Sequence, residues 1–237
     1  MITLIIPAYN EKLIIENTIK IAYEYLSNNF KEYEIIVVDD GSSDGTGNIV
    51  SRMNIENLRV ISYDKNRGKG YAVRQGIFAS KGDYIFFTDS DLAYGVEVIK
   101  PAYCKMKKEK GDVIIGSRKL SEDGYKNYPL KRLLASKIFS FITGLISGLS
   151  YDTQCGFKGF RKDVAIKIFE NCVIDRFAFD FEAMIVAKKM GFNILEIGVS
   201  IINHRESKVN IFKDSINMLK DIFKVKISTE KRIKEII

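Results

Sequence analysis

The sequence is poor in the residues that build metal cages and disulfide frameworks. Its 237 residues include one histidine and three cysteines, and no CxxC pair occurs. The cysteines, Cys104, Cys155 and Cys172, are widely spaced. An odd number of scattered cysteines beside a single histidine argues against both a disulfide framework and a zinc site, and it suits a reducing cytosol.

Long apolar runs are also missing. A helix needs about 20 predominantly apolar residues to span a bilayer, and the longest candidate, IFSFITGLISGL at 138–149, is too short. The first residues, MITLIIPAYNE, have no basic start followed by a long apolar core, so we interpret them as a strand rather than a signal peptide. We therefore expect a protein that does not span a membrane but is able to lie on one.

Two common nucleotide-binding patterns are absent as well. A dinucleotide-binding fold needs GxGxxG directly after the first strand, where this chain has PAYNE. A P-loop ends in Lys followed by Ser or Thr, and neither GSSDGTG nor NRGKGYA has that ending. Hydride transfer and ATP hydrolysis are therefore not favoured.

The chain is positively charged, and its composition is otherwise typical of a folded soluble protein. Its net charge is +7, with 46% hydrophobic and 28% charged residues. Such a balance fits an anionic partner, which leaves nucleic acid, a phosphorylated small molecule and an acidic membrane surface as alternatives. The basic residues cluster toward the C-terminus without interleaved aromatics or a recognised motif, so we expect no nucleic-acid partner.

Short Ile/Val-rich runs alternate with helical patterns through the first half. Strands are predicted at 2–7, 33–40, 58–64, 83–91 and 112–118, and helices within 11–29, 45–53 and 68–80. This alternation predicts an α/β fold with a mostly parallel central sheet flanked by helices.

The second half is less regular. It consists of a polar loop at 119–129, an amphipathic helix at 130–149, a polar glycine-containing stretch at 152–163, a helix at 179–191, a strand-like run at 192–204 and a basic helical tail. One domain over 1–208 followed by an amphipathic tail at 209–237 is the simplest organisation.

Polar clusters follow the predicted strands, at the edge where ligands bind in parallel sheets. In TDSD, Asp89 and Asp91 point the same way if the strand continues through them. Like charges at that distance need a cation or strong hydrogen bonds. The pair is therefore either a solvated strand end or a cation-binding site.

Taken in order, these clusters resemble a known family. IIPAYNE, VVDDGSSDGT, NRGKGYAVRQG, TDSD, GSR and DTQCGFKGF have the order and spacing of inverting family 2 glycosyltransferases with the GT-A fold, over residues 2–208. DTQCGFKGF, RFAFDFE and HRESK are most similar to the branch that makes dolichyl-phosphate glucose and related polyprenyl-phosphate sugars.

The resemblance implies a nucleotide-sugar site with Tyr9 near the base and a DxD motif at Asp89 and Asp91. Asp91 would ligate Mg²⁺ or Mn²⁺ that bridges the donor diphosphate, since hard cations prefer carboxylate and phosphate oxygens. Asp89, the other acid of the metal site, would contact the ribose or a metal-bound water. Mannose-transferring relatives carry Gln two residues after the motif, and Ala93 at that position favours the glucosyl branch. The implied donor-site residues are Pro7, Ala8, Tyr9, Glu11, Asp39, Asp40, Lys69, Asp89, Ser90 and Asp91.

The resemblance also implies a site for the phosphate of a polyprenyl (dolichyl) acceptor. Arginine offers a planar fork suited to phosphate oxygens. For each implied cation the alternative is a solvated or ion-paired surface side chain. The implied acceptor residues are Arg118, Arg132, Arg205 and Lys208.

The expected catalytic residues are Asp91, Arg118 and Asp180. An acceptor phosphate is already ionised at neutral pH, so a strong base is dispensable, and we expect His204 to be structural or near the phosphate. If a base is needed, Asp180 or Asp152 is the candidate. Asp180 could equally anchor a sugar hydroxyl, and Asp152 could cap a turn.

Two segments are candidates for contact with a membrane surface. The segment 130–149 combines an apolar stripe with flanking basic residues, and the tail 211–237 is similar. The alternatives are a helix packed on the sheet, a dimer contact or a solvated face. We expect a peripheral protein on the cytoplasmic face of a membrane, and the oligomeric state is not predicted.

Three other functions stay open: a family 2 enzyme acting on a glycan, protein or glycolipid hydroxyl, a mannosyl transferase using GDP-mannose, and a scaffold that has lost turnover.

Overall fold

The computed structural model describes residues 1–124 and 151–203. Within them, one seven-stranded sheet has the order β3-β2-β1-β4-β6-β5-β7. Only β6 runs antiparallel to its neighbours among these strands. The strands are β1 (Ile2–Ala8), β2 (Tyr33–Asp39), β3 (Leu58–Ser62), β4 (Tyr84–Phe87), β5 (Val113–Ser117), β6 (Lys158–Arg161) and β7 (Ile194–Gly198).

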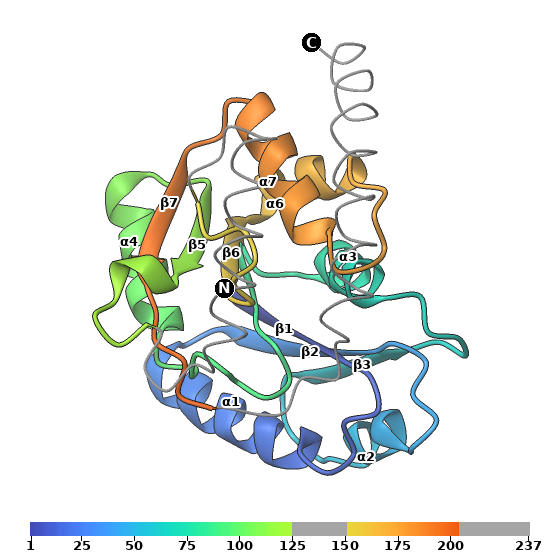
Figure 1. Ribbon diagram of the computed structural model, residues 1–237. Helices are drawn as coiled ribbons and strands as arrows, with labels where there is room; N and C mark the ends of the chain where they lie inside the picture. The colour runs from blue at the N-terminus through green and yellow to red at the C-terminus, as the bar shows by residue number, and fades with distance from the viewer. Residues whose placement is uncertain (125–150, 204–237) are drawn as a thin grey trace.

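Helices cover both faces of this sheet (Figure 1). Helices α1 and α2 pack together on one face, whereas α3 packs on β1 and β2 from the other face, beside α6 and α7. The described helices are α1 (Ile15–Asn29), α2 (Thr46–Ser51), α3 (Lys69–Ala79), α4 (Ile99–Glu109), α6 (Lys162–Glu170) and α7 (Phe179–Lys189), with a short 3-10 turn η1 (Arg118–Leu120).

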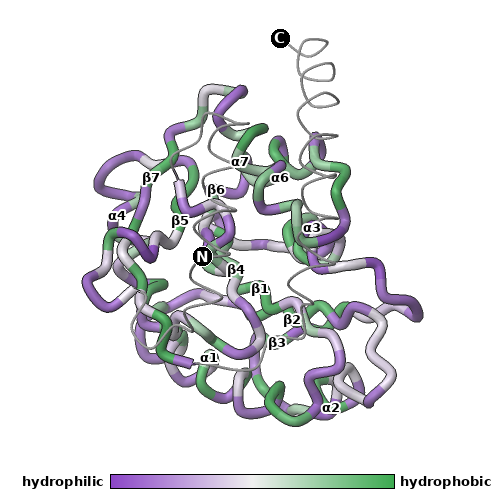
Figure 2. Tube along the Cα trace, viewed as in Figure 1, coloured by the Kyte–Doolittle hydropathy of each residue, from purple (hydrophilic) through white to green (hydrophobic). Residues whose placement is uncertain are grey.

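The burial of each element follows from its sequence pattern. Every residue of β1 and β2 is buried, as expected for parallel strands covered on both faces. Helix α1 instead buries one stripe, so hydrophobic and hydrophilic residues alternate along it (Figure 2). The buried stripe consists of Ile15, Thr18, Ile19, Ala22 and Leu26.

The predicted α/β class is confirmed, and two local predictions are wrong. The strand predicted at 83–91 ends at Phe87, so Asp89 and Asp91 lie in a turn and their proximity does not come from strand alternation. The stretch 152–163, for which no strand was predicted, contains β6 in the middle of the sheet. Four residues are too few for an alternating pattern to be recognised. A glycine at position 159 lets β6 pack in the sheet, because a Cβ there would come within 2.4 Å of the Phe86 ring.

The two predicted membrane-contact segments, 130–149 and 211–237, lie outside the described residues. Among residues 1–124 and 151–203, no helix combines the length and the apolar character needed to cross a bilayer. The proposed division at residue 208 also stays a prediction.

Candidate active site

The loops after β1 and β2 bind each other at the carboxyl edge of the sheet. The backbone N–H of Asn10 donates to Ser42 Oγ at 2.9 Å, and the Ser43 N–H donates back to Asn10 Oδ1 at 2.9 Å. The Glu11 N–H donates to Thr46 Oγ1 at 2.9 Å. These bonds hold the PAYNE segment against the start of α2.

The predicted pocket residues of β1 differ in how much they expose. Pro7 and Ala8 are buried within the strand, whereas the side chain of Tyr9, just past the strand end, is 43% exposed. Of these three, Tyr9 is therefore the most accessible to a ligand, and its predicted place near the base stays a prediction.

The two acids that follow β2 have different surroundings. Asp39 accepts a hydrogen bond from the Ser42 N–H at 3.1 Å and lies so close to Gly47 that a Cβ there would come within 2.2 Å of its Oδ2. A glycine at that position therefore lets α2 approach the carboxylate. The predicted binding of base or ribose by Asp39 stays a prediction.

Asp40 is fully hydrogen-bonded within the chain. Its two oxygens accept four bonds, from the Tyr63 hydroxyl at 2.7 Å, the Asn66 amide at 2.8 Å and the backbone N–H groups of Arg67 and Gly68 at 2.8 and 2.9 Å. A carboxylate has about four acceptor positions, so a nucleotide would have to displace one of these donors. The predicted direct role of Asp40 stays a prediction, and what the structure adds is that Asp40 shapes the loop leading to Lys69.

Lys69, the first residue of α3, reaches the DxD motif. Its Nζ lies 2.5 Å from Asp89 Oδ1. Burial lowers the pKa of Lys69, but the carboxylates of Asp89, Asp180 and Asp91 outweigh it and raise that pKa above the ordinary value. Gly156 approaches from the loop before β6, where a Cβ would come within 2.1 Å of Asp89 Oδ2. Asp89 is thus held between α3 and this loop.

Asp91 has a raised pKa. Burial is the main cause and the carboxylates of Asp89 and Glu11 add to it, against the lowering effects of the Ala93 N–H and Lys69. Its Oδ1 accepts a bond from the Ala93 N–H at 3.1 Å, while its backbone carbonyl accepts one from the Asn203 amide at 3.0 Å. These two hydrogen bonds to backbone groups hold the DxD turn in place.

The neighbouring Ser90 is buried, and its backbone carbonyl accepts a bond from the Thr18 hydroxyl of α1 at 2.6 Å. This contact ties the DxD turn to α1. The predicted role of Ser90 in donor binding stays a prediction.

Asp180, at the start of α7, is paired with a lysine that the sequence analysis missed. Lys158 on β6 is fully buried, and its Nζ lies 2.5 Å from Asp180 Oδ1 and 2.6 Å from the Cys155 carbonyl oxygen. Burial raises the pKa of Asp180, against the lowering effect of Lys158 and Lys69. The one available signal was a charged residue inside the aromatic run GFKGF. Whether Asp180 is a base or a sugar anchor stays a prediction.

Arg118 faces a protein carboxylate in this structure. Its Nε and one terminal nitrogen each lie 2.7 Å from an oxygen of Asp152, and both side chains are almost fully buried. Burial raises the pKa of Asp152, but Arg118 outweighs it and lowers that pKa below the ordinary value. An ion-paired acid of lowered pKa is a poor general base, which disfavours that role for Asp152. The predicted phosphate contact of Arg118 stays a prediction.

The other predicted acceptor residues lie outside the described part of the chain. They are Arg132, Arg205 and Lys208, and His204 is outside it too.

The carboxylates at this edge suit a cation that is shared with a substrate. Within the described ranges, no group of three or more His, Cys, Asp or Glu side chains is placed to enclose a metal ion. Mg²⁺ is commonly held by one or two carboxylates, water and substrate phosphates. Asp89 and Asp91 could provide such a pair. The pKa of Asp91 is raised mainly by burial and secondly by the carboxylate of Asp89, and a cation bound there would favour the ionised form.

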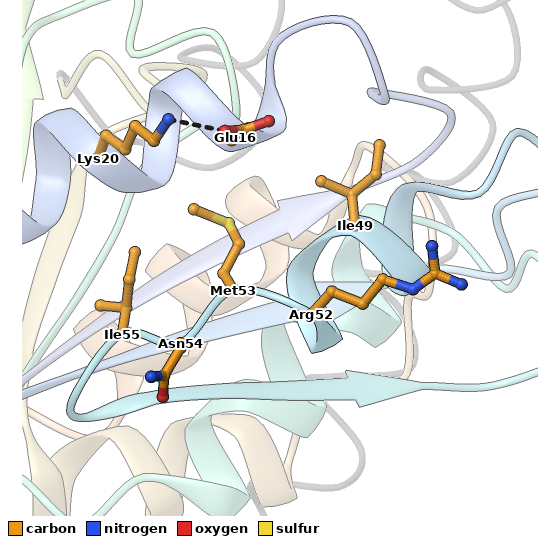
Figure 3. Close-up of a pocket in the computed structure, with 7 residues that line it drawn as sticks. All are labelled: Glu16, Lys20, Ile49, Arg52, Met53, Asn54 and Ile55. Carbon is orange, nitrogen blue, oxygen red and sulfur yellow. Dashed lines mark hydrogen bonds and ion pairs between the residues drawn. The ribbon is translucent and has the colours of Figure 1, made fainter.

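A separate surface hollow of about 390 Å³ lies between α1 and α2 (Figure 3). None of the predicted site residues lines it. Its lining consists of Glu16, Lys20, Ile49, Arg52, Met53, Asn54 and Ile55.

Comparison with known proteins identifies the family of the chain. The family model described as Glycosyl transferase family 2 matches residues 3–169. A dolichyl-phosphate beta-glucosyltransferase of Dictyostelium discoideum is 34% identical over 95% of this chain and 73% of its own length. The human protein of the same name is 32% identical over 95% of this chain and 75% of its own length.

Among solved structures, glucosyl-3-phosphoglycerate synthase from Mycobacterium tuberculosis, in complex with UDP, matches with a TM-score of 0.70. The identity is 18%, over 97% of this chain and 79% of the synthase chain, so this match supports the fold alone. The same synthase has been crystallised with Mn²⁺, UDP-glucose and phosphoglyceric acid, and that structure matches with a TM-score of 0.69. The resemblance inferred from the motifs is confirmed, and the chain belongs to glycosyl transferase family 2.

Proposed function

We propose that this protein transfers glucose from UDP-glucose, with inversion, to the phosphate of a dolichyl or other polyprenyl phosphate at a membrane surface. The observation that carries the proposal is the meeting of Lys69, Asp89 and Asp91 at the carboxyl edge of the sheet. It occurs in a chain 34% identical to a dolichyl-phosphate beta-glucosyltransferase.

The donor would lie along this edge, with its base near Tyr9 and its diphosphate near the DxD turn. Asp89 and Asp91 would hold Mg²⁺ or Mn²⁺, which when bound supplies positive charge to the departing diphosphate. Structures of the mycobacterial synthase with Mn²⁺ or Mg²⁺ support this metal use. Lys69 adds a second positive charge, at the start of a helix, where anions are favoured.

In the reaction, an oxygen of the acceptor phosphate attacks the anomeric carbon as the bond to the nucleoside diphosphate breaks. That oxygen is ionised at neutral pH, so the protein need not remove a proton. Asp180, held by Lys158, is then better suited to accept a hydrogen bond from a sugar hydroxyl than to act as a base. Arg118, Arg132, Arg205 and Lys208 are proposed to bind the acceptor phosphate.

We propose that the protein acts as a peripheral enzyme on the cytoplasmic face, with 130–149 and the basic tail against the lipid surface. The competing hypotheses are a hydroxyl acceptor, which would need a general base, and GDP-mannose as the donor.

The test is a screen of purified protein with nucleotide sugars, Mg²⁺ or Mn²⁺, and either polyprenyl phosphate or soluble glycans, with products detected by mass spectrometry. Glucosyl polyprenyl phosphate formed from UDP-glucose supports the proposal. Transfer only to glycans, or only from GDP-mannose, contradicts it. Asp91→Ala should abolish transfer without changing the far-UV circular dichroism spectrum, and full activity in that variant would remove the metal from the proposed mechanism.

A further inference from the structure

The ion pair between Lys69 and Asp89 occupies the carboxylate that the proposed function assigns to a divalent cation. The lysine Nζ lies 2.5 Å from Asp89 Oδ1, and the two side chains are 19% and 34% exposed. A contact this short in a partly buried setting is stronger than a surface ion pair. Lys69 therefore neutralises Asp89 within the chain itself.

The surroundings of Lys69 offer its ammonium group a second partner. Three carboxylates act on it, those of Asp89, Asp180 and Asp91. Asp180 is also bonded to Lys158, which holds it in place. The ammonium is thus under the influence of several acids, and lysine carries it on a flexible four-carbon stem.

A divalent cation and an ammonium group cannot both lie against Asp89 without strong mutual repulsion. The repulsion grows with the product of the charges and with burial, so it is larger for a divalent cation than for a monovalent one and larger here than at an open surface. Binding of the cation to Asp89 therefore requires Lys69 to move. A donor diphosphate would offer Lys69 an anionic partner in the same region.

We infer that Lys69 is an exchangeable counter-ion which couples divalent-cation binding to nucleoside-diphosphate binding. This inference rests on the proposed function and goes beyond it. In the free chain Lys69 neutralises Asp89 and weakens cation binding. When a nucleoside diphosphate binds, the Lys69 side chain moves from Asp89 to the phosphates, and Asp89 becomes available to the cation. Each ligand then tightens the binding of the other by the same factor, as linkage requires.

The test measures binding of Mn²⁺ directly, by the loss of the free-ion signal in electron paramagnetic resonance, with and without UDP. The variants are Lys69→Met and, as a matched control, Lys20→Met, which removes an exposed lysine paired with Glu16. Without UDP, Lys69→Met should bind Mn²⁺ on the order of tenfold more tightly than the wild type, because the competing charge is gone. UDP should tighten Mn²⁺ binding strongly in the wild type and in Lys20→Met, and much less in Lys69→Met.

Unchanged or weaker Mn²⁺ binding by Lys69→Met without UDP overturns the exchange. Failure of the wild type to bind Mn²⁺ even with UDP overturns the metal assignment in the proposed function, so the two failures are distinguishable. Lys69→Arg provides a second variant that keeps the charge. It should bind Mn²⁺ without UDP as weakly as the wild type, and tight binding by this variant also contradicts the inference.

Discussion

The buried pair of Lys158 and Asp180 offers a sharp test of how the site is held together. Lys158 is 0% exposed and Asp180 is 5% exposed, with 2.5 Å between the lysine nitrogen and the carboxylate oxygen. Lys158→Met keeps most of the side-chain volume but removes the charge. We expect it to lower the free energy of unfolding by about 3–5 kcal/mol, because Asp180 is left as a buried charge without its main partner.

This loss is large beside the total stability of a domain, which is about 5–15 kcal/mol. The double variant Lys158→Met with Asp180→Asn leaves no buried charge at the pair, so it should recover to within about 1–2 kcal/mol of the wild type. It should nevertheless be inactive if Asp180 contacts the sugar. A double variant that is stable but inactive would show that Asp180 contributes to sugar transfer separately from its contribution to folding.

The assay is urea unfolding followed by far-UV circular dichroism, since the chain has no tryptophan. Lys105→Met is the matched control, because Lys105 forms a more exposed pair with Glu109 one helical turn away. Such pairs contribute about 0.3–0.5 kcal/mol. The reasoning is refuted if Lys158→Met loses no more than this control, or if the double variant is as unstable as the sum of the two single changes.

Three further predictions follow from the site. Gly156→Ala should weaken Mn²⁺ binding in the presence of UDP, measured by the same resonance signal, because a Cβ would come within 2.1 Å of the Asp89 carboxylate; unchanged binding would contradict the predicted placement. Tyr9→Ala should raise the dissociation constant of UDP by about tenfold, measured calorimetrically, if the exposed ring stacks on the base, and Tyr9→Phe should not. Asp152→Asn should lower the free energy of unfolding at pH 7, and its difference from the wild type should shrink below about pH 4. The pKa of Asp152 is lowered in the folded state, so the stability that its charge contributes is present above the pKa of the unfolded state and is lost on acidification. A gap independent of pH would show that Arg118 is not stabilised by that charge.

Much of the architecture could be predicted from local patterns. Apolar runs such as EIIVV and the helical spacing in α1 predict buried parallel strands and a covering helix, because each pattern reflects burial along one element. Motif order was enough to identify the family. The antiparallel β6 could not be found in this way, since its four residues include a lysine and a glycine, and the first three are buried only because neighbouring strands enclose them.

The sequence by itself determined the α/β class, the position of the polar clusters at the carboxyl edge and the identity of the DxD acids. Only the tertiary structure decided the partners of those groups. It pairs Lys69 with Asp89, Lys158 with Asp180 and Arg118 with Asp152, and the last two pairs join residues 22 and 34 positions apart. The spacing of charged residues along the sequence does not predict their partners, because ion pairing depends on which distant segments the fold brings within a few ångströms of each other.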